Sequence, residues 1–307
     1  FNTQPTIPEF KALVKELGMA IISQTSDLAP ADKRLYGIRD ITATVESIPL
    51  ITGSILSKKL ASGLDALTMD VKVGNGAMMN SLEDATALAK SIANVANGAG
   101  VKTQAIITDM NQVLGASAGN AIEIIETVNY LTGDYRETRL HEVVVKLAES
   151  MLINTGLASD VVQANAKIEG VLSSGEAAEL FSKMIAQMGG PSDLLTNPWN
   201  SMQQANVQQD IVAPGDGYIS AMQTRDIGLT IVGMGGGRTA NGQTINHTVG
   251  LDNVQPVGTK VSKGDVLARI HATDAEQATW ASKAYIEALS FSDNAPEVPP
   301  VIYSVID

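Results

Sequence analysis

Arg39, Ser54 and Lys58 are the residues whose types and spacing could do chemistry together. Ser54 and Lys58 are four residues apart in an expected helix, so they lie one turn from each other on the same face. Arg39 lies in the expected helix just before it. The three side chains offer N–H and O–H donors and one hydroxyl acceptor, which suit a ligand rich in carbonyl oxygens. A plain alternative also fits, in which Ser54 and Lys58 face solvent and Arg39 pairs with an acid.

Two helices joined near residues 46–49 must position this set. Ser47 can cap the second helix and Pro49 suits its first turn, where a missing N–H is no loss. Around this pair, residues 7–17 predict a helix ended by Gly18, and residues 19–22 predict a short buried parallel strand. Residues 64–73 and 101–108 predict further strands, separated by a helix that begins after Ser81. This alternation predicts a parallel sheet covered by helices.

The rest of the sequence predicts more helices, followed by a second region of short strands and turns. Helices are expected at 120–131, 138–153, 160–172 and 175–188, followed by a boundary at 189–206 that contains Pro and Gly and no clean period. Residues 207–272 then predict a small antiparallel β unit, residues 275–289 a helix and residues 301–305 a last strand. The expected class is α/β with a C-terminal α+β domain that has a barrel-sandwich-like β unit. The expected domains are an α/β domain (1–30 and 64–205), a helical segment carrying the ligand-binding residues (31–63) and the C-terminal domain (206–307).

Composition excludes several classes of function. The 307 residues are 44% hydrophobic and 18% charged, which is typical of a globular protein. The net charge of −12 argues against a nucleic-acid partner. The sequence has no cysteine, which excludes disulfides and thiolate metal sites. No apolar run reaches roughly 18 residues, so we expect no membrane span.

Other motifs give weaker indications of a site. The glycine-rich run 233–238 lacks the Lys-Ser/Thr of a phosphate loop, so a tight turn or close backbone packing is expected there. The turn 74–76 follows a strand and precedes a helix, so a ligand-facing role is more plausible, although a dinucleotide fingerprint needs a third glycine. His141, His247 and His271 lie far apart in the sequence and are expected to be structural. The β unit is similar in rhythm to biotinyl and lipoyl carrier domains, but no lysine stands at its central hairpin.

Residues 26–77, SDLAPADKRLYGIRDITATVESIPLITGSILSKKLASGLDALTMDVKVGNGA, resemble the signature region of thymidine and pyrimidine nucleoside phosphorylases without a gap. The resemblance continues to the end of the sequence. It implies a pentosyltransferase that converts thymidine and phosphate to thymine and 2-deoxyribose 1-phosphate in pyrimidine salvage. It also implies a cytoplasmic homodimer with a cleft between a helical and an α/β domain. Phosphate is then a co-substrate and no cofactor is expected.

The resemblance implies roles for individual residues. Arg39, Ser54 and Lys58 match the residues that hold the pyrimidine base, and Tyr36 and Ile51 match residues that line its pocket. Arg39 and Lys58 would stabilise negative charge on the leaving base, which makes them the catalytic pair. No resident metal is expected beyond a monovalent cation, which the resemblance places at Leu114, Ser117 and Glu126. The alternative is that Glu126 is a solvated helix residue.

One part of the family pattern is missing from the sequence. The family binds phosphate with a Lys-His-Ser-Thr-Gly-Gly loop, and no such loop occurs here. We therefore expect part of a longer protein, through cloning, cleavage or natural truncation, that is inactive alone. The alternative function is an inactive binding or assembly module of the same fold. An anthranilate phosphoribosyltransferase-like enzyme would need pyrophosphate-binding Gly and Asp-Glu motifs, which are also absent.

Overall fold

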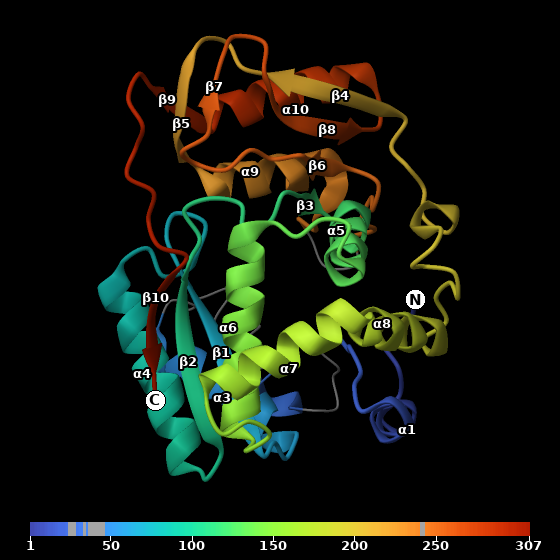
Figure 1. The fold of residues 1–307 in the computed structure, drawn as a ribbon, viewed down its shortest axis with the longest axis vertical. Helices are drawn as coiled ribbons and strands as arrows, with labels where there is room; N and C mark the ends of the chain where they lie inside the picture. The colour runs from blue at the N-terminus through green and yellow to red at the C-terminus, as the bar shows by residue number, and fades with distance from the viewer. Residues whose placement is uncertain (24–28, 33–34, 36–46, 240–242) are drawn as a thin grey trace.

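The computed structural model describes residues 1–23, 29–32, 35, 47–239 and 243–307. The elements between residues 207 and 292 gather at one end of the molecule, and most of the earlier helices surround a small sheet at the other end (Figure 1). Within the described ranges, no helix is both long enough and apolar enough to cross a bilayer.

The N-terminal helix forms as predicted. α1 (Ile7–Leu17) begins with a capping box between Thr6 and Glu9 and ends at Gly18, whose φ of 79° is left-handed. The expected strand at 19–22 is wrong, because these residues pair with no strand and Ile21 is 45% exposed. Instead α1 packs its apolar face against α8 (Glu176–Gln187). Residues 19–22 therefore pack over a pair of helices. Periodicity alone cannot distinguish a short apolar run of this kind from a buried strand.

A three-stranded sheet forms the centre of the larger part. β1 (Ala66–Val73) and β2 (Lys102–Asp109) are parallel in the register Ala66↔Lys102 to Val73↔Asp109, as the sequence predicted. α4 (Leu82–Gly98) connects them and begins at Ser81, whose hydroxyl accepts the Asp84 N–H at 3.1 Å. The last strand, β10 (Ile302–Ile306), pairs antiparallel with β2 and completes the order β1-β2-β10. The sheet is therefore mixed, and its third strand comes from the far end of the chain (Figure 1).

The two faces of β1 differ in character. One face is apolar and packs with α4 and α3 (Ile48–Ala61) through a buried cluster that includes Val71, Val73 and Ile51. The other face is polar and lies against α6 (Thr138–Asn154). There Lys72 lies 2.7 Å from the Asp70 carboxylate, which also accepts a bond from the Thr108 hydroxyl.

The remaining helices of this part confirm the predicted pattern. They are α5 (Ala121–Thr132) and α7 (Val161–Ser174) together with α6 and α8. Gly133 ends α5 and Gly175 ends α7, each in the left-handed region. After α8 a single 3₁₀ turn, η1 (Pro198–Asn200), interrupts the segment that leads to the C-terminal elements.

The C-terminal elements form two small antiparallel sheets with two helices. One sheet has the order β3-β6-β8-β4 and the other β7-β5-β9. Their strands are β3 (Ala118–Gly119), β4 (Val207–Val212), β5 (Gly217–Met222), β6 (Gly250–Asp252), β7 (Lys260–Val261), β8 (Val266–Ala272) and β9 (Leu289–Ser292). The helices are α9 (Thr224–Ile231) and α10 (Ala275–Glu287), of which only α10 was predicted. β3 lies upstream of the predicted boundary, so the second sheet region draws on both sides of it.

α9 escaped prediction because half of its residues are Thr or Ile, which favour strands. Its eight residues include Thr, Ile and Gly, which are weak helix formers, and burial of Ile227 and Ile231 holds it in place. The expectation of a tight turn or close backbone packing in the glycine run is confirmed at η2 (Val232–Gly236), which follows α9 and bends at Gly235, where φ is 93°. Close packing is present there, because a Cβ on Gly236 would lie 2.7 Å from Ile231 Cγ2.

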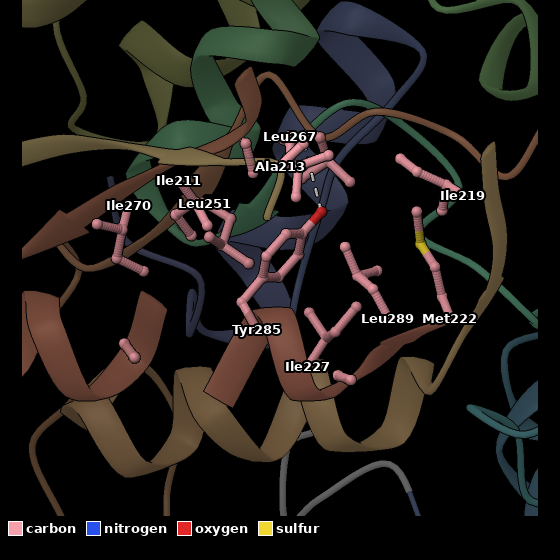
Figure 2. Close-up of a cluster of buried hydrophobic side chains, with 14 of the residues drawn as sticks. Ile211, Ala213, Ile219, Met222, Ile227, Leu251, Leu267, Ile270, Tyr285 and Leu289 are labelled. Atoms are coloured by element: carbon pink, nitrogen blue, oxygen red, sulfur yellow. Dashed lines mark hydrogen bonds between the residues drawn. The ribbon is translucent and has the colours of Figure 1, made fainter. Parts of the chain in front are cut away.

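Tyr285 occupies the centre of the C-terminal core. It rises from α10 between Ile211, Ile219, Ile227 and Leu289, and it has no solvent-exposed surface (Figure 2). Its hydroxyl donates a long hydrogen bond of 3.5 Å to the carbonyl of Leu267. Burial raises the pKa of this hydroxyl, so the ring acts as a large neutral filler.

We expect Tyr285→Ala to lower the free energy of unfolding by about 4 kcal/mol, because it leaves a cavity that the surrounding sheets cannot close. Tyr285→Phe keeps the ring and loses only the long hydrogen bond, so we expect a loss of about 1 kcal/mol or less. Urea unfolding of the two variants and the parent protein measures both values. Equal losses for Ala and Phe would show that the hydroxyl, and not the ring, supports the core.

Candidate functional site

One face of α3 carries the residues that the sequence analysis grouped. Ile51, Ser54 and Lys58 follow each other at helical spacing, and Pro49 stands in the first turn as expected. Ser47 precedes the helix, but its side chain makes no capping hydrogen bond, so that detail of the prediction is wrong. On the neighbouring face, the hydroxyls of Thr52 and Ser91 share a hydrogen bond of 2.8 Å that fixes α3 on α4.

The Lys58 ammonium is held in one place by two partners. Its Nζ lies 2.5 Å from Asp32 Oδ2 and donates to Ser54 Oγ at 3.2 Å. Asp32 is 7% exposed and Lys58 is 25% exposed, so the pair is partly shielded from water. An ammonium has three N–H donors, and described residues take two of them. Lys58 is therefore oriented in advance, and its third N–H has no partner among the described residues.

Asp32 is the residue that the sequence analysis missed. It stands 26 residues before Lys58, so no helical or strand period connects the two. The only available signal was an acid placed just after Pro30, at the start of the helical segment. The structure thus finds a carboxylate beside the predicted donors.

The other predicted base-site residues have different outcomes. Ile51 is buried in the cluster between α3, α4 and the sheet, one turn before Ser54. Arg39 and Tyr36 lie outside the described residues, so their places in the site stay predictions.

Two of the three predicted cation residues meet, namely Ser117 in the loop before α5 and Glu126 on α5 itself, and Leu114 precedes them in the same loop. Glu126 Oε1 accepts the Ala116 N–H at 2.6 Å, and its Oε2 accepts the Ser117 hydroxyl. A Cβ on Gly115 would lie 2.5 Å from Glu126 Oε1, so a larger residue there would displace this carboxylate. Described residues include no group of three or more His, Cys, Asp or Glu that could hold a metal. A cation beside Leu114 and Ser117 would therefore need backbone carbonyl oxygens as well as Glu126.

The histidines have separate local partners. His271 Nε2 is hydrogen-bonded to Asp252 at 2.9 Å between β8 and β6, and His141 Nδ1 to the Tyr130 hydroxyl at 2.9 Å. The carbonyl of His247 accepts the Ala121 N–H. These positions lie on different elements, which agrees with structural roles.

Comparison with known proteins gives matches along the chain. Residues 1–178 match the α/β domain of a glycosyl transferase family, and residues 218–292 match the pyrimidine nucleoside phosphorylase C-terminal domain. The thymidine phosphorylase of Colwellia psychrerythraea strain 34H is 62% identical over 303 residues, which are 99% of this chain and 69% of that protein. The chain belongs to the thymidine and pyrimidine nucleoside phosphorylase family.

Membership of the nucleoside phosphorylase family decides between the families that the sequence analysis considered. The match over 218–292 assigns the C-terminal β unit to a nucleoside phosphorylase domain, although its rhythm is similar to that of carrier domains. The same domain argues against an anthranilate phosphoribosyltransferase-like protein. The family is one of transferases, so the α3 face belongs to an enzyme fold.

A cavity lies beside the loop that precedes α5. Its volume is about 360 Å³, and its lining includes Gly115, Tyr135, Glu137 and Asn253. Burial raises the pKa of the Glu137 carboxyl above its ordinary value, and the negative charge of Glu126 adds to the rise. Glu137 also accepts the Leu140 N–H at 2.7 Å and so caps α6.

The raised pKa of Glu137 predicts how stability depends on pH. The folded protein holds this proton more tightly than the unfolded chain, so the contribution of Glu137 to stability falls as pH rises through its folded pKa. Glu137→Gln keeps an acceptor for the helix cap and cannot ionise. We expect the difference in Tm, variant minus parent, to become more positive between about pH 4 and about pH 7.

Thermal unfolding at a series of pH values measures this difference. Glu142→Gln, an exposed position on α6, is the matched control and should show a flatter profile. A difference that becomes more negative with rising pH would contradict a raised pKa at Glu137.

Proposed function

We propose that this chain carries the pyrimidine-binding side of a thymidine phosphorylase site. The reaction is the reversible phosphorolysis of thymidine to thymine and 2-deoxyribose 1-phosphate in pyrimidine salvage. The observation that carries the proposal is the oriented Lys58, held by Ser54 of α3 and by Asp32 of an earlier segment, in a chain that is 62% identical to a thymidine phosphorylase. The family resemblance extends the proposal to a cytoplasmic homodimer.

The chemistry explains why donors are needed at this face. When phosphate attacks C1′, the C1′–N1 bond breaks and its electron pair moves to the base, where O2 and O4 share the negative charge. Lys58 and Arg39 would donate to these oxygens, which stabilises the transition state more than the neutral nucleoside. Ser54 can accept from N3–H or donate to O4. Ile51 and Tyr36 would line the pocket around the ring.

Asp32 makes the lysine an effective donor in this scheme. A free lysine loses side-chain entropy when it orders around a ligand, whereas Lys58 already lies 2.5 Å from a shielded carboxylate. The pair therefore presents the third N–H in a fixed direction. Preorganised donors of this kind cost little reorganisation when charge develops.

We expect Lys58→Ala to weaken thymine binding to this chain by about tenfold to a hundredfold, the loss typical of a charged hydrogen bond. Ser54→Ala should weaken it less, by about tenfold, because a neutral bond is lost. Titration calorimetry with thymine measures both. Lys59→Ala is the control, since Lys59 is the exposed neighbour on α3. Unchanged affinity in Lys58→Ala would remove Lys58 from the site.

A second candidate is a binding or assembly module without turnover. It is favoured by the absence of a Lys-His-Ser-Thr-Gly-Gly loop from the sequence, because phosphate then has no recognisable cradle. We expect this chain alone to bind thymine and to release none from thymidine and phosphate. Thymine release followed by absorbance tests this directly, and turnover that depends on Lys58 would refute the inactivity. Failure to bind thymine as well would favour the module.

The proposed monovalent cation site at Leu114, Ser117 and Glu126 predicts a salt-specific stability. A cation that binds only the folded state stabilises it by mass action, so potassium should raise Tm by about 2 °C over choline at equal ionic strength. Glu126→Gln should abolish the difference. Glu123→Gln, a nearby acid on α5, should retain it. Equal potassium effects in the parent and Glu126→Gln would exclude Glu126 as a ligand.

A further inference from the structure

The turn 74–76 lies where β1 ends, at the carboxyl edge of the parallel strand pair. In open α/β sheets, ligands bind outside the carboxyl ends of the strands. The sequence analysis gave this turn a more plausible ligand-facing role than the glycine run 233–238, and the α3 face does not use it. The contacts of the turn 74–76 are therefore relevant to the geometry of the candidate site on α3.

The side chain of Asn75 joins this turn to the C-terminal elements. Its Nδ2 donates to the Met222 carbonyl at 2.8 Å, and its Oδ1 accepts the Thr224 N–H at 2.7 Å. These partners are 147 and 149 residues further along the chain. Arg225 adds a bond from Nη2 to the Ala77 carbonyl at 3.0 Å. Both ends of the Asn75 amide are thus satisfied by backbone groups at the end of β5 and the start of α9.

The two glycines show how closely the turn is enclosed. Gly74 has φ of 130°, and a Cβ there would lie 2.7 Å from Asn111 Cγ. A Cβ on Gly76 would lie 2.8 Å from Thr224 Cβ. The turn is therefore clamped between the loop after β2 and the N-terminus of α9, and each glycine is required by one of these contacts.

The buried carboxylate of Asp109 supports the contacts of this turn through Asn111. Asn111 Oδ1 accepts the Asn75 backbone N–H at 3.0 Å, while its Nδ2 donates to Asp109 Oδ1 at 2.7 Å. Asp109 is 1% exposed and also receives Arg139 Nη2 at 2.9 Å and the Tyr303 hydroxyl at 3.3 Å. Arg139 and Tyr303 hold the Asp109 carboxylate in place, and the carboxylate in turn fixes the orientation of the Asn111 amide.

The turn is connected to α3 through packed side chains. The Gly74 N–H donates to the Met79 carbonyl at 3.1 Å, which closes the turn. Met79 and Val73 are buried in the same cluster as Ile51 of α3. Ser54 and Lys58 stand on that face of α3, so displacement of the turn would disturb the packing beneath the candidate base site.

We propose that Asn75 is a positioning residue through which the C-terminal elements hold the turn 74–76 in place. Through Met79 this turn also keeps α3 in the position that binds the base. The link to binding rests on the proposed function. The C-terminal unit then helps to shape the nucleoside site without contributing a donor to it.

Two variants remove the same hydrogen bond from opposite sides. Asn75→Ala deletes the amide, and Thr224→Pro deletes the N–H donor at the first position of α9, where proline is tolerated. Asn97→Ala is the control, because Asn97 makes two side-chain bonds to the backbone of Thr103 at the opposite end of β2. The readouts are amide hydrogen exchange at residues 74–79, thymine affinity and Tm.

We expect exchange at 74–79 to accelerate about tenfold or more and thymine affinity to fall about tenfold in both variants, with the double variant adding little. Asn97→Ala should change neither. Unchanged exchange in both variants would overturn the clamp, and faster exchange with unchanged affinity would overturn its coupling to the site. If the parent chain binds no thymine, the proposed function fails, and exchange still decides whether Asn75 holds the turn.

Discussion

The carboxylate of Asp109 is the point on which the arrangement of this molecule depends most. It is buried at the end of β2, and a buried charge is tolerated only when partners compensate the lost hydration. Its partners come from three separate parts of the chain, namely α6, the loop after β2 and β10. Because each must be in place to satisfy the carboxylate, this one requirement coordinates the sheet, a covering helix and the final strand.

Local signals predicted local structure well. Gly18 and Gly133 end helices in the left-handed conformation that their positions suggested, and Ser81 begins α4 with a capping bond. The failures share a different cause. Residues 19–22 and α9 take their conformation from tertiary packing. The last strand was predicted, but its pairing with β2, nearly 200 residues earlier in the chain, was not. No window of the sequence contains that information.

The residues of the candidate site likewise divide into those that the local sequence predicted and those that it could not predict. Helical period placed Ser54 and Lys58 on one face, and the structure brings their polar atoms to 3.2 Å. Period could not identify Asp32, whose importance appears only when two distant segments meet. Arg39 and Tyr36 rest on the family resemblance alone. Their contribution depends on residues 36–46, which lie outside the described ranges.

The position of β10 has a consequence for synthesis of the protein. A ribosome delivers β1 and β2 long before residues 302–306, so the nascent sheet has two strands and an unpaired edge on β2 while the C-terminal elements are still being made. The Asp109 carboxylate meanwhile lacks the Tyr303 hydroxyl. An open strand edge can pair with other chains. The interval between translation of β2 and of β10 is therefore when this polypeptide is most exposed to misassembly, and when a chaperone that shields strand edges would protect it most.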